Sequence, residues 1–195
     1  MARRRMCRDF ATTPLRPEVV DRLAEAALGA PAAGNTHGLH LVALVGDQTA
    51  RYWDVTLPAP ARERFRWPGL LRAPLLLVPY VSPQAYLQRY SEPDKSASGL
   101  GRAAEDWAVP YWFVDGGAAV MATLLAAEVE GLGALFFGQF DHERAVAGEL
   151  GVPAGMRALG TVAVGHAAEE HGASESRSAR RGRPDPDRHL HPGGW

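Results

Sequence analysis

DGGAAVMATLLAAEVEGLGALFFGQF, residues 115–140, is the most informative segment of the chain. Apolar side chains occupy nearly every position of 118–127, which predicts a helix buried in its own domain or against a partner chain. We place this helix over 115–130, with Asp115 as its N-cap. Two glycines end it, and residues 134–137 then predict a strand. This order of elements indicates a mixed α/β or α+β fold.

Shorter patterns on either side of this segment predict the remaining elements. Apolar residues at helical spacing after a proline favour a first helix over 17–28. Pro79 weakens one expected strand, because proline cannot donate to the ladder. The other expectations are strands over 39–45, 75–81 and 159–164, a short helix and a Pro-rich loop within 47–73, and a capped helix over 141–150.

Two segments differ from the rest in composition. Residues 82–112 are polar and aromatic and are interrupted by Pro and Gly, which predicts a long excursion over the surface. Residues 167–195 are rich in charge, Pro and Gly and have almost no core residues, which predicts an extended basic tail. We therefore expect a single domain, 1–195, that ends in this tail.

Length, charge and cysteine content exclude several classes of protein. With 195 residues and a net charge of −1, the chain suits one domain without a strong electrostatic field. Cys7 is its only cysteine, so it has no internal disulfide and no cysteine-based metal cluster. No run approaches the roughly 18 apolar residues of a membrane helix. We expect no nucleic-acid partner, no membrane and a cytoplasmic location.

The familiar catalytic motifs are incomplete or absent. Residues 29–36 nearly form a P-loop, but Asn35 replaces the lysine that binds phosphate, and the loop follows a helix. The sequence has no Gly-x-Ser-x-Gly motif, and its histidines lack the spacing of metal ligands. If the chain is an enzyme, we expect no catalytic side chain and a cofactor that supplies the chemistry.

Two arginine clusters lie at opposite ends of the chain. Their planar donor groups match phosphate oxygens, so both termini together could form a phosphate site. The alternative is that both clusters are solvated tails. The clusters are Arg3, Arg4, Arg5 and Arg8, and then Arg177, Arg180, Arg181 and Arg183.

Several features follow one another along the chain in a specific order. They are the opening Arg4–Phe10, a helix, the loop Ala30–Asn35 before a strand, the buried helix leading into Gly131–Gly133 and Phe137–Phe140, and Arg181–Pro184. In this order and spacing, essentially the whole chain resembles the nitroreductase family of FMN-dependent oxidoreductases.

The resemblance implies an α+β fold, a three-layer sandwich with a central mixed or antiparallel sheet flanked by helices. It also implies an intertwined homodimer in which both subunits touch each of two FMN molecules. The basic tail, 167–195, would then dock on the flavin site or on the partner subunit.

The resemblance also assigns residues to the cofactor. Arg4, Arg181 and Arg183 would hold the FMN phosphate, and Arg5 and Met6 belong to the same opening motif. Arg8 would lie at the flavin pyrimidine edge, where a cation stabilises the reduced ring. The partner subunit would contribute Pro31, Ala32, Ala33 and Asn35. Phe137, Gly138 and Gln139 would lie along the ring, with a backbone N–H facing the reactive nitrogen.

Some positions depart from the family pattern. Met6 stands in place of the usual serine after the opening basic pair, and residues 36–38 replace the common polar-Gln-Pro sequence. The family's mid-chain Asn and Lys contacts have no clear match. These departures leave room for a subfamily with different chemistry.

The resemblance implies a two-step, ping-pong cycle. NAD(P)H donates hydride to FMN, and a nitroaromatic, a quinone or another activated small molecule then accepts the electrons. One alternative is a flavin storage or sensor protein, or a pathway-specific flavin dehydrogenase, and another is a non-enzymatic interaction protein. Five aromatic residues of the excursion could line the cleft or could be structural: Tyr86, Tyr90, Trp107, Tyr111 and Trp112.

Overall fold

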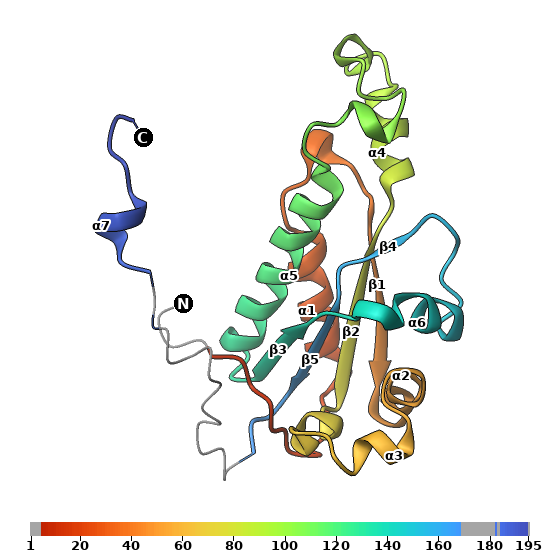
Figure 1. The fold of residues 1–195 in the computed structure, drawn as a ribbon, viewed down its shortest axis with the longest axis vertical. Coiled ribbons are helices and arrows are strands. Elements are labelled where there is room, and N and C mark those ends of the chain that lie inside the picture. The colour runs from red at the N-terminus through yellow and green to blue at the C-terminus, as the bar shows by residue number, and fades with distance from the viewer. Residues whose placement is uncertain (1–4, 169–181, 183, 195) are drawn as a thin grey trace.

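The computed structural model describes residues 5–168, 182 and 184–194, and Figure 1 shows their arrangement. Its centre is a sheet in the order β1-β2-β5-β3, with β4 beside β2, and all of its strand pairs are antiparallel. The strands are β1 (Leu39–Val45), β2 (Leu75–Val81), β3 (Gly133–Phe137), β4 (Arg157–Ala158) and β5 (Thr161–Gly165). The expected α+β class is therefore confirmed.

Helices cover both faces of this sheet. Figure 1 shows α1 and α5 on one side and α2 and α6 on the other. The helices are α1 (Pro17–Leu28), α2 (Thr49–Thr56), α3 (Ala59–Arg62), α4 (Pro83–Tyr90), α5 (Tyr111–Val129), α6 (Glu143–Glu149) and α7 (Pro186–His189).

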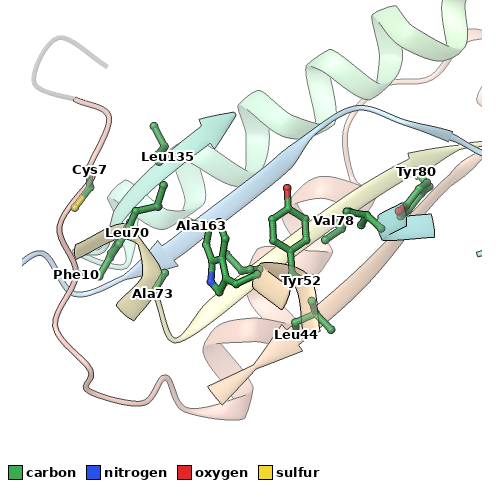
Figure 2. Close-up of a cluster of buried hydrophobic side chains, with 13 residues drawn as sticks. Cys7, Phe10, Leu44, Tyr52, Leu70, Ala73, Val78, Tyr80, Leu135 and Ala163 are labelled. Atoms are coloured by element: carbon green, nitrogen blue, oxygen red, sulfur yellow. The ribbon is translucent and has the colours of Figure 1, made fainter. Parts of the chain in front are cut away.

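Strand β2 explains why both faces are covered. Its side chains alternate between the faces, so Leu75 and Leu77 pack with α1 and α5, whereas Leu76 and Val78 join the cluster under α2 and α6. All seven residues of β2 are buried, as expected for a continuous apolar run. Figure 2 shows the second cluster lying along the sheet, from Cys7 at one end to Tyr80 at the other.

Pro79 occupies a position in β2 where its missing N–H does little harm. Strand β5 pairs with residues 75–77 and β4 pairs with residues 80–81, so Pro79 falls in the gap between these two neighbours. Its carbonyl still accepts the Leu159 N–H at 3.0 Å. The strand predicted over 75–81 is confirmed in spite of the proline.

The N-terminal boundary of α5 corrects one expectation. The helix begins at Tyr111, directly after Pro110, and Asp115 therefore lies inside it instead of capping it. A proline just before the first turn fixes a backbone angle compatible with helix entry, so the helix starts earlier than the apolar pattern suggested.

The segment 82–112 is also more ordered than expected. It contains α4, whose N-terminus is capped by the Ser82 hydroxyl oxygen accepting the Ala85 N–H at 3.2 Å. Tyr86, Trp107 and Trp112 are buried against one another in a third apolar cluster. The expected excursion over the surface is confirmed for most of its residues, which are exposed or half-buried, but these three aromatic residues form a small core of their own.

Helix α5 is long and apolar enough to cross a membrane by length and composition alone, with a mean hydropathy of 1.4. The expectation that no such stretch exists is corrected. Val120, Leu124 and Ala127 are nevertheless buried in the cluster shared with α1 and the sheet. This packing makes α5 a core helix.

Candidate functional site

The segment around residues 5–10 is fixed beside β3. The Cys7 N–H donates to the Ala134 carbonyl at 2.9 Å, and Met6 forms a parallel bridge to the same residue. Phe10 is completely buried, and its N–H donates to the Gly69 carbonyl at 3.2 Å. Two segments far apart in the sequence, the basic opening and β3, are therefore neighbours.

A cavity of about 360 Å³ opens beside this junction. It brings together Arg8, Phe137, Gly138 and Gln139, as the sequence analysis expected for one ligand. The remaining lining residues are Tyr52, Trp53, Thr56, Leu57, Phe65, Trp67, Leu70, Leu135, Phe136, Phe140 and His142. The volume lies within the range of small-molecule sites, roughly 300–1,000 Å³.

Aromatic rings form much of the cavity wall. Trp53 stacks on Phe137, with ring centroids 6.0 Å apart and planes 7° from parallel. Tyr52 meets both rings edge-on. Two guanidinium groups lie over the Trp67 ring, those of Arg8 at 5.5 Å and Arg66 at 5.2 Å from its ring centre. These flat apolar surfaces suit a planar aromatic ligand.

A buried polar network supports the cavity from inside. The Gln139 amide donates to the Gly160 carbonyl and to the Thr161 hydroxyl, both at 3.3 Å, and Thr161 donates to the Tyr52 hydroxyl at 3.0 Å. Burial raises the pKa of Tyr52 to about 12, so its phenol stays protonated at neutral pH. Because this network engages the Gln139 side chain, residue 139 can face a ligand with its backbone, next to the Phe137 ring.

The turn after β3 keeps that backbone accessible. A Cβ on Gly138 would lie 3.1 Å from the Phe140 ring, so a side chain here would crowd Phe140. Phe140 adopts a left-handed backbone with φ of 48° and is 86% exposed. A bulky residue in this conformation is strained, and such strain is typical of functional sites.

Arg8 supplies positive charge to the cavity. Its guanidinium contacts the Met6 carbonyl at 3.4 Å and the Trp67 ring, and within the described residues it has no carboxylate partner. The charge is therefore available to an anionic ligand. No group of three metal-ligating side chains occurs in the described part of the chain.

The structure does not bring the other expected contacts to this cavity within one chain. The loop 31–35 follows α1 and lies beside α4, whereas the segment containing Arg8 lies at the opposite end of the molecule (Figure 1). Arg5 is exposed, and Arg4, Arg181 and Arg183 lie outside the described residues. A ligand that touches both Arg8 and Asn35 would require two copies of the chain.

Sequence reasoning missed most of the cavity wall. Tyr52, Trp53, Phe65 and Trp67 come from the segment 47–73, in which the motif search found no chemistry. Their aromatic density was the one available signal.

The aromatic candidates of 82–112 separate into two groups. Tyr86 and Trp112 are buried in the third cluster and are structural. Tyr90 and Tyr111, together with Ala33, line a separate hollow of about 590 Å³ at the loop end of the molecule, and Trp107 belongs to both this lining and the third cluster. The segment therefore contributes both a core and a surface hollow.

Comparison with known proteins places the chain in a family. The model of the nitroreductase family matches residues 1–166. The chain belongs to the nitroreductase family, and it is therefore an oxidoreductase. The resemblance noted in the sequence is confirmed.

Solved structures with the same fold include several nitroreductases. NfrA1 nitroreductase from B. subtilis is 20% identical, with a TM-score of 0.73 over 100% of this chain and 72% of that one. An FMN-dependent nitroreductase from Clostridium difficile is 19% identical, with a TM-score of 0.66 over 99% and 96%. NfrA2 from B. megaterium is 18% identical, with a TM-score of 0.69 over 98% and 71%.

Proposed function

We propose that two copies of this chain bind FMN between them and transfer hydride from NAD(P)H to a nitroaromatic, a quinone or a similar activated acceptor. The observation that carries the proposal is the cavity that Arg8 lines together with residues 137–139. The sequence motif order supports the same grouping.

The residues of the cavity fit the flavin ring of FMN. The stacked and edge-on rings of Tyr52, Trp53 and Phe137 match a flat apolar surface. Arg8 offers the one guanidinium among the lining residues, and Gly138 has no side chain that would cover the backbone there. The chemistry that FMN supplies when bound is two-electron transfer as hydride.

The protein groups then have distinct roles. Arg8 would hold negative charge at one edge of the ligand, which favours its reduced form. The aromatic wall would exclude water from the inner side of the cavity. Arg4, Arg181 and Arg183 are proposed to bind the phosphate, with Arg5 and Met6 beside them.

The outer face of α5 supports a homodimer. Val114, Ala118, Leu125 and Val129 lie at helical spacing on the side away from the buried Val120 and Leu124, with Ala118 and Leu125 half-buried. Val129 is 85% exposed and Val114 is 50% exposed in the single chain. An apolar stripe of this kind is typical of a face that a second subunit covers.

A second copy would complete the cofactor site. We propose that it brings Pro31, Ala32, Ala33 and Asn35 to the cavity, because one chain holds these residues at its opposite end. The basic tail, 167–195, is proposed to dock on the flavin site or on the partner subunit. The 68% exposure of Leu190 in this tail is consistent with docking.

The visible absorption spectrum of the purified protein tests this function. We expect flavin bands, either at once or after addition of FMN, and we expect NADH or NADPH to bleach them without oxygen. Recovery of the bands on addition of a quinone would complete the cycle. Bleaching with no turnover of any acceptor would favour flavin storage or sensing, and a protein that takes up no FMN would overturn the proposal.

A further inference from the structure

The loop after α1 has an unusual backbone. Gly34 and Asn35 are consecutive left-handed residues, with φ of 66° and 55°. The turn is closed by the Asn35 N–H donating to the Ala32 carbonyl at 2.9 Å and by the Thr36 hydroxyl donating to the Ala33 carbonyl at 2.7 Å. The Asn35 carboxamide is exposed and has no polar partner in the described part of the chain.

Asp115 holds one side of this loop. Its Oδ2 atom accepts the Ala33 N–H at 2.7 Å and the Tyr86 hydroxyl at 2.8 Å. Burial and the neighbouring Asp115 carboxylate both raise the pKa of Tyr86, so the phenol keeps its proton and remains a donor. Asp115 is thus not a helix cap but a charged acceptor that joins α5 to the loop.

Arg89 holds the other side. Its Nε donates to the Gly34 carbonyl at 2.8 Å, and its two terminal nitrogens donate to the Asp94 carboxylate at 2.7 Å each. The two-pronged pair with Asp94 fixes the plane of the guanidinium group. Tyr90 packs so closely that a Cβ on Gly34 would lie 2.9 Å from its ring. The loop is therefore held by three residues, Asp115, Arg89 and Tyr90.

We propose that Asp115 and Arg89 are positioning residues that preset this loop so that Asn35 points outward toward the FMN of a second subunit. The inference rests on the proposed function. A loop already ordered in the free chain loses less conformational entropy when the ligand binds, which strengthens binding. Because Asp115 adjoins Val114 on the exposed stripe of α5, the position of the loop is also tied to the proposed dimer contact.

Amide hydrogen exchange tests, without any flavin, whether Asp115 and Arg89 fix this loop. We expect the Ala33 N–H to exchange about tenfold faster or more in Asp115→Ala, because a hydrogen bond to a charged acceptor is lost. Asp115→Asn retains an acceptor oxygen and should restore most of the protection. Arg89→Gln removes the bond to Gly34 and serves as a second variant should Asp115→Ala not fold.

Glu130→Gln is the matched control. It weakens the salt bridge between Arg22 of α1 and Glu130, whose side-chain atoms lie 2.7 Å apart. Glu130 directly follows the C-terminus of α5, whereas Asp115 lies near its N-terminus. This change disturbs the same helix pair but does not touch the loop. Exchange of Ala33 and affinity for FMN should both stay at wild-type values.

A double-mutant cycle separates positioning from general structural support. Asp115→Ala and Asn35→Ala should each weaken FMN binding. The fold loss of FMN affinity in the double variant should be smaller than the product of the two single fold losses. Either of two results would overturn the positioning role and leave the proposed function standing. One is a loss of FMN affinity in the double variant equal to the product of the single losses, and the other is unchanged Ala33 exchange in both Asp115→Ala and Arg89→Gln. A wild-type protein that takes up no FMN would overturn the proposed function, and this inference with it.

Discussion

The two ends of the molecule hold their proposed flavin contacts by different means. At the cavity end, the backbone of Cys7 pairs with Ala134, and Trp53 stacks on Phe137 inside the protein. At the loop end, the backbone of Ala33 and Gly34 is held by the charged side chains of Asp115 and Arg89. Backbone pairing and ring stacking therefore hold the first end, whereas charged side chains add to the packing of the second.

The largest effect is expected from packing at the cavity end. Trp53→Ala should lower the free energy of unfolding by about 3–5 kcal/mol, because it leaves a void under Phe137. Trp53→Phe should cost much less, since a ring remains and the indole N–H has no hydrogen-bond partner in the described residues. Chemical denaturation of the three proteins measures both values, and equal costs for the two variants would contradict the packing role.

A smaller effect is expected from the charge at the cavity. Arg8→Ala should weaken FMN binding about tenfold or more and make the bound flavin harder to reduce, because a charged contact is lost. Arg66→Ala is the matched control: Arg66 flanks the same Trp67 ring but does not line the cavity. Fluorescence titration and redox titration would detect both changes. If the two variants behave alike, Arg8 has no special role.

The smallest effect is expected from acid at the loop end. The Arg89 guanidinium holds the pKa of Asp94 below its usual value of 3.8, so this pair favours the folded loop above that pH and loses its contribution as the pH falls through the lowered pKa. Protection of the Gly34–Asn35 backbone should then decline in acid. Asp94→Asn should lack this decline, and a decline of the same size in that variant would assign it to another group.

The cavity end could be grouped from the sequence because its key residues belong to motifs. Arg8 and residues 137–139 line one cavity because the opening segment adds to the edge of β3, and the family resemblance assigned both to one ligand. The aromatic wall from 52–67 was missed because it forms only when the chain folds, and the density of aromatic residues was its one signal in the sequence.

The loop end was harder to predict because its contacts depend on tertiary structure. Asp115 was expected to cap a helix, but the helix begins earlier, after Pro110, and the carboxylate turns to the loop instead. Tyr86, Trp107 and Trp112 were placed on a surface excursion, although they bury one another. A hydrogen bond between distant segments leaves no periodic pattern in the sequence, and neither does a small local core. Neither could therefore be predicted from the spacing of residues.

A mixed dimer tests most directly whether the two ends belong to different subunits of one site. One subunit would carry Arg8→Ala and the other Asn35→Ala, with different tags for purification. If each site combines the cavity of one chain with the loop of the other, one site contains both changes and the second contains neither. We therefore predict one FMN per mixed dimer bound with wild-type affinity, and two sites weakened alike would contradict the shared site.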